Sequence, residues 1–543
     1  MQVRIVVGQP WEARADVLVV PVFGGRRDAS GATTGEDGED ASAGPLIDGV
    51  LGELDRRLGG ELRALAAFGE LTGKRNALTM TAGGGVAGGP GASDGSDSAI
   101  TGAGEGAGRI LLAGAGDPQK LTAEAVLHLA AAARRKLGGR TVRTVAIWLE
   151  PLAARLPGGL AAAAELATRG TVLGGFDPAT IYREHVKSAP PVLDELVLVV
   201  PAGADPAALA RAADRGRIIG EGSNWARRLS DRTANDVTPE VLADEAATIA
   251  ARHGLWIDVI SPERATQLGM GMFMAIGKGS VNPPRMIVVR SGAEGQRDAL
   301  GRHLALVGKG VCFDTGGLSL KPSSGMLTMK HDKTGACTVL AAIDTVSRLA
   351  PGTPLLVVAP AVENMPGPYS TRPSDVVTAL NGKRVEITNT DAEGRLILGD
   401  ALVYAERLGA THLVDVATLT GAAHRALGSF DTPTFGTDDD FNAALAAAGR
   451  AAGERFWPLP LVEELRADLN SPYADLLNSP SQPEGGAIHA ALFLREFVTR
   501  PWAHLDIAGT AYLRSAAAWG PKGATGVTHA TLVELALAGA ASR

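Results

Sequence analysis

Short apolar runs alternate with longer helical patterns over the first 230 residues of the chain. The runs that predict strands are Val3 to Val7, Val17 to Phe23, Ile110 to Ala113, Thr144 to Leu149 and Glu195 to Val200. The patterns that predict helices are Ala123 to Lys136, Leu160 to Thr168 and about Pro206 to Ser230. This alternation is typical of an α/β layer with a mainly parallel sheet.

The remainder of the chain repeats the alternation. Strands are predicted at Arg285 to Arg290, His303 to Val307, Leu355 to Ala359, Arg384 to Ile387 and Thr411 to Val416, and helices at Gly335 to Leu349 and Leu396 to Leu408. A chain of 543 residues is too long for one ordinary core. We therefore expect two domains, with the boundary near residues 185 to 205.

Two Gly-rich polar stretches, at about 24–44 and 83–108, interrupt the first domain. Neither has apolar periodicity, so we predict surface loops there.

The net charge of −7 argues against nucleic acid as the general partner of this chain. The only cysteines, Cys312 and Cys337, are too few for a disulfide framework, which suits a reducing compartment. The N-terminus does not have the pattern of a signal peptide, and no apolar stretch is long enough to span a membrane. These features predict a soluble cytoplasmic protein with no membrane partner.

The segment from Asn389 to Leu396 carries the first candidate chemistry. In an extended backbone, Asp391 and Glu393 would project to the same side and bring two carboxylates together. Gly394 permits close approach to a ligand, and Arg395 can hold an anion bidentately. Taken alone, the segment also fits a solvated loop that leads into a helix.

Three upstream positions add further charged groups. The strand at 303–307 ends in Gly308-Lys309-Gly310, which lacks the order of a phosphate-binding P-loop. Asp314 precedes a turn of small residues and could instead cap that turn. Asp332 stands before a predicted helix, where capping is the better interpretation of the residue on its own.

Four acids with a lysine suit a pair of divalent metal ions. The acids are Asp314, Asp332, Asp391 and Glu393. A lysine can ligate only as the neutral amine, so its pKa must be lowered by neighbouring cations. Oxygen ligands favour Zn, Mn or Mg over a metal that prefers thiolate ligands.

The sequence resembles the leucyl aminopeptidases (cytosol aminopeptidases) of the M17 metallopeptidase family. The resemblance covers roughly residues 206 to 535. The segment Asn389-Thr390-Asp391-Ala392-Glu393-Gly394-Arg395-Leu396 matches the family signature. Further similar segments are Gly269-Met270-Gly271, Glu363-Asn364-Met365-Pro366, Asp415 to Ala422, Gly485 to Ile488 and His504 to Gly509.

This resemblance implies the fold. It is an α/β protein with a smaller N-terminal α/β (macro-like) domain over 1–195, followed over 206–543 by a catalytic α/β domain with a mixed central sheet flanked by helices. It also implies a homohexamer that acts on peptides with a free N-terminus and releases Leu and other residues.

The resemblance further implies the role of each site residue. Lys309, Asp314, Asp332 and Glu393 would hold one metal ion, and Asp314, Asp391 and Glu393 the other. The ions would be Mn or Zn, with Mg or Co possible. Lys321 would polarise the scissile carbonyl, and Arg395 would hold a bicarbonate that acts as general base. Residues that would line the pocket for the first substrate residue are Met329, Asn389, Thr418, Leu419 and Gly421.

Departures from the family pattern near the site are Thr315, His331 and Lys333, and the extra cation at Lys333 could alter substrate preference or metal affinity. Alternative functions are a DNA-binding or regulatory protein on an aminopeptidase scaffold, a catalytically silent assembly protein, and a different two-metal hydrolase such as a phosphatase.

Overall fold

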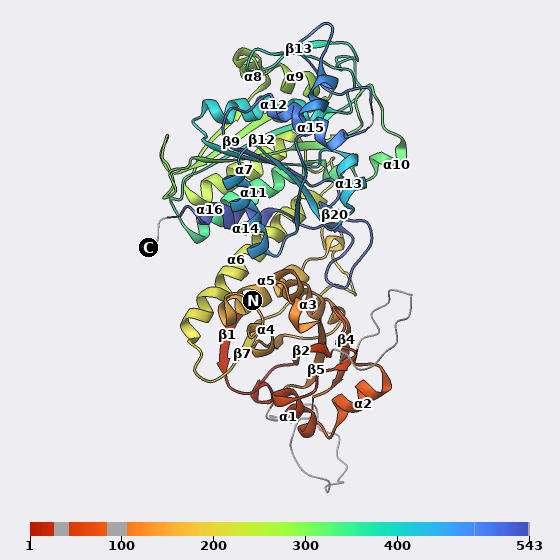
Figure 1. Ribbon diagram of the computed structural model, residues 1–543, viewed down its shortest axis with the longest axis vertical. Helices are drawn as coiled ribbons and strands as arrows, with labels where there is room; N and C mark the ends of the chain where they lie inside the picture. Colours follow the sequence, from red (N-terminus) through yellow and green to blue (C-terminus); the bar gives the residue numbers. More distant parts are fainter. Residues whose placement is uncertain (26–42, 84–105, 483, 541–543) are drawn as a thin grey trace. The chain divides into compact units, whose positions relative to one another are not determined.

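The computed structural model describes residues 1–25, 43–83, 106–482 and 484–540 (Figure 1). Most of both Gly-rich stretches, residues 26–42 and 84–105, lies outside the described residues, so the loops predicted there stay predictions. The chain forms two compact units, one of residues 1–221 with 516–521 and the other of 222–515 with 522–543. This division falls inside helix α6 (Pro206–Asp231), and the sequence-based boundary between 195 and 206 stays a prediction.

The first unit contains a mainly parallel sheet in the order β1-β7-β6-β2-β5-β4, with β3 paired to β2. The pairs β4–β5 and β2–β3 are antiparallel, and the others are parallel. Its strands are β1 (Gln2–Val7), β2 (Val17–Gly25), β3 (Ala43–Pro45), β4 (Leu78–Ala82), β5 (Arg109–Gly116), β6 (Thr144–Trp148) and β7 (Glu195–Val200). Besides the first part of α6, the α-helices of this unit are α1 (Gly49–Arg57), α2 (Glu61–Phe68), α3 (Ala123–Lys136), α4 (Glu150–Ala153) and α5 (Gly159–Gly174).

Strand β2 shows why this sheet needs helices on both faces. Side chains alternate across a strand, so Val17 and Val19 pack into one apolar cluster with α3 and α5, whereas Leu18 and Val20 pack into another with α1 and α2. A strand that is apolar at every position is therefore buried on both sides, as is usual in parallel sheets.

The second unit is built on a larger mixed sheet in the order β17-β16-β19-β15-β10-β12-β9-β8, with β11 paired to β12. Its strands are β8 (Trp256–Ile260), β9 (Arg285–Ser291), β10 (Leu304–Gly308), β11 (Gly310–Asp314), β12 (Leu355–Asn364), β15 (His412–Ala417), β16 (Thr432–Gly436), β17 (Phe456–Pro458) and β19 (Trp502–Asp506). Smaller sheets are formed by β13 (Val376–Thr378), β14 (Arg384–Glu386) and β18 (Leu476–Leu477), and by β20 (Tyr512–Leu513) and β21 (Gly523–Ala524).

Helices cover both faces of this sheet (Figure 1). One group is α8 (Pro262–Leu268), α9 (Gly271–Gly277), α12 (Glu393–Arg407) and α15 (Gly486–Arg495); the other is α7 (Pro239–His253), α11 (Thr334–Leu349), α14 (Asp439–Ala452) and α16 (His529–Leu537). Short helices are α10 (Ser323–Met326), the 3-10 helix η4 (Met329–Lys333) and α13 (Gly421–Leu427). All ten residues of β12 are buried, as expected for a strand between two helical layers.

The predicted two-domain α/β architecture is confirmed. The helix predicted at 123–136 and the strand predicted at 195–200 have the observed bounds. Within the part of the chain that the structure describes, no helix is long and apolar enough to cross a membrane.

Candidate active site

Strand ends bring the candidate residues together at one edge of the larger sheet. Strand β10 pairs in parallel with both β12 and β15, and β11 pairs in parallel with β12. The carboxyl ends of these four strands therefore lie at the same edge of the sheet. Lys309 follows β10, Asp314 ends β11 and Thr418 follows β15. Ligand sites in open α/β sheets form at such an edge.

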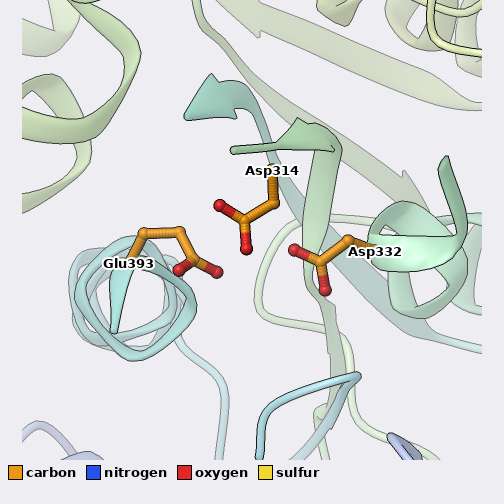
Figure 2. Close-up of side chains that lie close together, drawn as sticks. All are labelled: Asp314, Asp332 and Glu393. Atoms are coloured by element: carbon orange, nitrogen blue, oxygen red, sulfur yellow. The ribbon is translucent and has the colours of Figure 1, made fainter. Parts of the chain in front are cut away.

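Asp314, Asp332 and Glu393 form a buried acidic cluster. Their carboxylates point toward one another from β11, η4 and the first residue of α12 (Figure 2). One oxygen from each side chain lies within 4.8 Å of the others, and all three residues are buried. Like charges at this separation repel, so they need cations between them.

Lys309 is one of these cations. Its Nζ lies 2.9 Å from Asp332 Oδ1 and 2.7 Å from Glu393 Oε1, and it donates a hydrogen bond of 2.9 Å to the carbonyl oxygen of Thr418. The side chain crosses the first turn of α12 at Gly394, where a Cβ atom would stand 2.7 Å from Nζ. Glycine at position 394 therefore makes room for the lysine.

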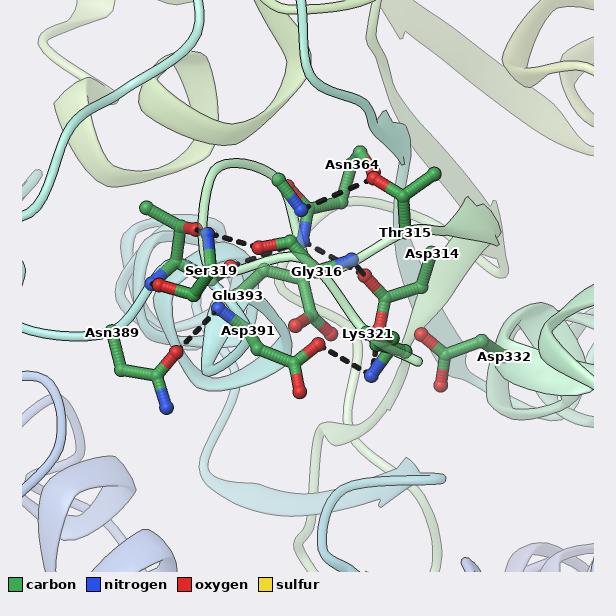
Figure 3. A network of polar contacts seen from close by, with 12 residues as sticks. Asp314, Thr315, Gly316, Ser319, Lys321, Asp332, Asn364, Asn389, Asp391 and Glu393 are labelled. Atoms are coloured by element: carbon green, nitrogen blue, oxygen red, sulfur yellow. Dashed lines mark hydrogen bonds and ion pairs between the residues drawn. The ribbon is translucent and has the colours of Figure 1, made fainter. Parts of the chain in front are cut away.

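Lys321 is the second cation, and it joins the remaining acid to the cluster. Its Nζ lies 2.8 Å from Asp314 Oδ2 and also forms an ion pair with Asp391 (Figure 3). The Asp391 backbone N–H donates to Asn389 Oδ1 at 2.8 Å, which closes the turn that carries the acid.

The extended backbone predicted around Asp391 and Glu393 is wrong. Asp391 lies in a turn, and Glu393 is the first residue of α12. The carboxylates approach the same site because a turn leads directly into a helix. Asn478 holds this turn, since its side-chain amide donates to the Asn389 carbonyl oxygen at 2.7 Å and its Oδ1 accepts from the Thr388 N–H at 2.9 Å.

The capping role considered for Asp332 is also wrong. The cap position of α11 is Lys333, and no side chain caps that end. The Asp332 carboxylate instead accepts a hydrogen bond of 2.7 Å from Thr418 Oγ1. Asp314 does bond its own turn, because its Oδ1 accepts from the Gly316 N–H at 2.8 Å, and it also lies in the cluster.

The electrostatics follow from burial and from the crowding of charges. Burial raises the pKa of Asp314 to about 7, and the charges of Glu393 and Asp332 act in the same direction. Burial and the same kind of repulsion raise the pKa of Asp391 to about 6. Burial acts to lower the pKa of Lys309, but the attraction of Asp332, Glu393 and Asp314 outweighs it and the pKa is raised. Lys309 is thus a cation among these acids, and ligation of a metal by its amine requires loss of a proton.

The donor set fits divalent metal ions. Among the described residues, Asp332 Oδ2 and Glu393 Oε2 are buried without a hydrogen-bond partner. Buried polar atoms without a partner are rare in native proteins and call for an unseen ligand or a special role. Carboxylate oxygens suit hard or borderline divalent cations.

Arg395 is buried and does not line the cavity. Its Nη1 donates to the carbonyl oxygen of Asn478 at 3.0 Å, and its Nε has no hydrogen-bond partner among the described residues. Burial lowers the pKa of Arg395 to about 10, which still leaves it charged at neutral pH. An unpaired buried cationic donor fits an anion.

A cavity of about 190 Å³ opens at the acidic cluster. The predicted site residues that line it are Lys309, Asp314, Lys321, Met329, Asp332, Asp391, Glu393, Thr418, Leu419 and Gly421. Asn389 and Arg395 do not line it. His331, which the sequence placed near the site, also lines it. Lining residues to which the sequence assigned no role at the site are Thr328, Thr420, His424, Ala508, Tyr512 and Arg514. Ala508 stands in a segment that resembles the family; no sequence signal points to Arg514.

Lys333 does not line the cavity. Its buried Nζ donates to the carbonyl oxygens of Lys330 at 2.6 Å, Arg232 at 2.8 Å and Ser230 at 3.2 Å. His331 lines the cavity but lies outside the acidic cluster, and its ring stacks on Tyr512 with centroids 4.9 Å apart.

Comparison with known proteins agrees with this geometry. Residues 224–533 match the model of the cytosol aminopeptidase family catalytic domain, and residues 91–177 match the model of its N-terminal domain. The chain is 40% identical to a probable cytosol aminopeptidase of Solibacter usitatus, over 99% of both chains. A probable cytosol aminopeptidase of Geobacter is 41% identical over 78% of this chain and 85% of the relative.

Solved structures give the same result. A mutant of tomato leucine aminopeptidase is similar with a TM-score of 0.82 and 29% identity, over 99% of this chain and 96% of that one. The bottromycin maturation enzyme BotP in complex with Mn is similar with a TM-score of 0.75 and 33% identity, over 96% and 99%. This chain therefore belongs to the cytosol aminopeptidase family and is a hydrolase of the metallo-aminopeptidase type.

Proposed function

We propose that this protein releases N-terminal residues, Leu among them, from peptides by means of two divalent metal ions bound at the acidic cluster. The observation that carries the proposal is the pair of buried carboxylate oxygens without hydrogen-bond partners, on Asp332 and Glu393, two residues that line the cavity.

The proposed ligands divide between two ions. Lys309, Asp314, Asp332 and Glu393 would hold one, and Asp314, Asp391 and Glu393 the other. Mn or Zn is proposed, with Mg or Co as substitutes; the similar BotP structure is a complex with Mn. When bound, the ions would supply Lewis-acid polarisation and lower the pKa of a water molecule.

Two cationic side chains of the protein, Lys321 and Arg395, would assist the reaction. Lys321 Nζ is held by Asp314 and Asp391, so its positive charge is already oriented at the cavity wall. A preorganised cation stabilises the negative charge that develops on the carbonyl oxygen during peptide hydrolysis. Arg395 would hold the bicarbonate proposed as general base, through the Nε donor that has no partner within the described chain.

The proposed pocket for the first substrate residue consists of Met329, Thr418, Leu419 and Gly421 at the cavity wall, with Asn389 outside it. The homohexamer is a proposal from the resemblance, and the cytoplasmic location is a proposal from the sequence pattern.

The test is hydrolysis of a panel of aminoacyl-p-nitroanilides with Zn, Mn, Mg or Co, alongside measurement of metal content per subunit. Glu393→Ala should lose both metal and activity, and Lys321→Ala should lose activity. Exposed residues provide matched controls, Glu464→Ala and Lys136→Ala, which should behave as the wild type. Unchanged activity in both site variants would refute the proposed site.

A further inference from the structure

Arg514 differs from the other basic residues that line the cavity. Lys309 and Lys321 each form ion pairs with two carboxylates. His331 Nδ1 lies 3.3 Å from Ser230 Oγ, and its ring stacks on that of Tyr512, so this side chain is held by its neighbours. His424 Nδ1 lies 3.2 Å from the carbonyl oxygen of Gly428.

The guanidinium of Arg514 is exposed at the cavity wall. Within the described ranges it has no hydrogen bond or ion pair. Its five N–H donors are therefore available to a ligand.

The backbone that carries Arg514 is held in place. Arg514 follows β20, which pairs antiparallel with β21 through Tyr512–Ala524 and Leu513–Gly523. The Ala524 N–H donates to the Asp231 carboxylate at 3.1 Å. The Tyr512 ring stacks on His331, and its hydroxyl donates to Thr328 Oγ1 at 3.4 Å. The ribbon thus fixes the position of the arginine while its donors stay open.

The chain offers Arg514 no carboxylate of its own within this cavity. The four acids that line it are Asp314, Asp332, Asp391 and Glu393, and each pairs with Lys309 or Lys321. A planar guanidinium matches a carboxylate with two parallel hydrogen bonds. The complement of Arg514 is therefore a carboxylate on the substrate.

The position in the cavity indicates which carboxylate this is. The residues proposed to surround the first substrate residue, among them Met329, Thr418 and Leu419, line the same cavity as Arg514. The cavity has a volume of about 190 Å³, below the range of about 300–1,000 Å³ that is typical of sites for drug-sized ligands. A cavity of this size suits one amino-acid side chain. We propose that Arg514 binds the side-chain carboxylate of an N-terminal Glu or Asp, so that acidic first residues are preferred over their amides. This inference rests on the proposed aminopeptidase function.

The first test compares glutamyl- and glutaminyl-p-nitroanilide, which differ only in the charge of the first residue. The wild-type kcat/KM should favour the glutamyl substrate, and Arg514→Gln should lower the ratio about tenfold, as expected for loss of a hydrogen bond to a charged group. Arg514→Glu should invert the preference toward lysyl-p-nitroanilide. Arg450→Gln, at an exposed arginine on α14, is the matched control and should leave the ratio unchanged. A ratio of one or less in the wild type, or an equal ratio in Arg514→Gln, overturns the inference.

A second comparison separates the side chain from the C-terminus of a short substrate. Leu-Gly and Leu-Gly-amide differ in their C-terminal carboxylate alone. If Arg514→Gln changes the ratio for this pair and not the ratio for the glutamyl pair, Arg514 binds the C-terminus and the inference is wrong.

Thermal stabilisation by free L-glutamate relative to L-glutamine gives a readout without turnover. The shift should be larger for glutamate in the wild type and equal for both amino acids in Arg514→Gln; equal shifts in the wild type contradict the inference. Hydrolysis of leucyl-p-nitroanilide with no glutamyl preference defeats this inference alone. Loss of turnover on every substrate defeats the proposed function, and the thermal shifts then still decide the role of Arg514.

Discussion

Asp415 on β15 has both carboxylate oxygens bonded within the chain, whereas Asp332 and Glu393 in the acidic cluster each retain one oxygen without a partner. Asp415 Oδ1 lies 2.6 Å from His504 Nδ1, and Oδ2 accepts from Trp502 Nε1 at 2.7 Å. All these residues are buried. Burial of an acid therefore does not by itself indicate a ligand site; the informative feature is an oxygen that the chain leaves unsatisfied.

The largest expected effect on activity comes from the acidic cluster, whose carboxylate oxygens are not all hydrogen-bonded. Asp332→Ala removes an oxygen that we propose as a metal ligand. Metal content should fall, and kcat/KM should decrease more than about 1,000-fold, which corresponds to about 4 kcal/mol. Elemental analysis and anilide hydrolysis measure the two quantities. A variant that retains full metal content would show that the unpaired oxygen is not a ligand.

Asp415→Ala should act on stability and not on metal binding. It leaves the Trp502 N–H and a buried histidine without their partner, and loss of one member of a buried pair costs about 3 kcal/mol or more. Denaturant unfolding measures the loss, and metal content of the folded fraction should equal that of the wild type. If Asp415→Ala lost metal without loss of stability, Asp415 would be part of the metal site and the comparison with the acidic cluster would be wrong.

Thr418→Val probes a contact next to the cluster. The substitution keeps the shape of the side chain but removes the hydroxyl that donates to Asp332 Oδ1. Loss of such a supporting hydrogen bond should weaken metal affinity about tenfold. Titration calorimetry measures the affinity, and Thr248→Val, on the exposed side of α7, is the control. Equal affinity in both variants would mean that the hydroxyl does not support the ligand.

The smallest effect is a pH dependence of stability at His504. Burial acts to lower the pKa of His504, but the Asp415 carboxylate outweighs it, and the pKa is raised above 6.5. A raised pKa means that the folded protein holds a proton that the unfolded chain releases. The stabilisation is therefore complete below about pH 6.5 and is lost as pH rises through the folded pKa, with a slope of at most about 1.4 kcal/mol per pH unit.

The measurement compares the unfolding free energy of the wild type with that of His504→Gln from pH 6 to 9. The difference between the two proteins should shrink as pH rises. A difference that stays constant would show that His504 is neutral throughout.

Local patterns predicted the elements well, but contacts that depend on turns were not predictable. Helix α3 has the bounds predicted from its apolar periodicity, because that pattern is local. Asp391 and Glu393 approach each other because Asn478, about 90 residues further along the chain, stabilises the turn between them and the preceding strand. The spacing of the two acids in the sequence does not predict this contact. The pairing of Asp332 with Lys309 and Thr418 is likewise a tertiary contact, which local capping rules cannot predict.

Arg514 illustrates the limit most clearly. It follows a two-residue strand that pairs with Gly523 and Ala524, and neither segment has an apolar pattern long enough to predict a ribbon. The orientation of Lys333 away from the cavity was equally hidden, because it depends on backbone carbonyl groups that the sequence does not mark.

The glycine beneath Lys309 has a consequence for how such an enzyme can diversify. Any side chain at position 394 would collide with the lysine, and a side chain at Gly335 would stand 2.1 Å from the carbonyl oxygen of Val416. Substitution of either glycine therefore displaces Lys309 or the backbone that supports it, whatever its effect on substrate choice. Arg514, at the end of the β20–β21 ribbon, is exposed, so a substitution there can alter the cavity wall without displacing buried backbone.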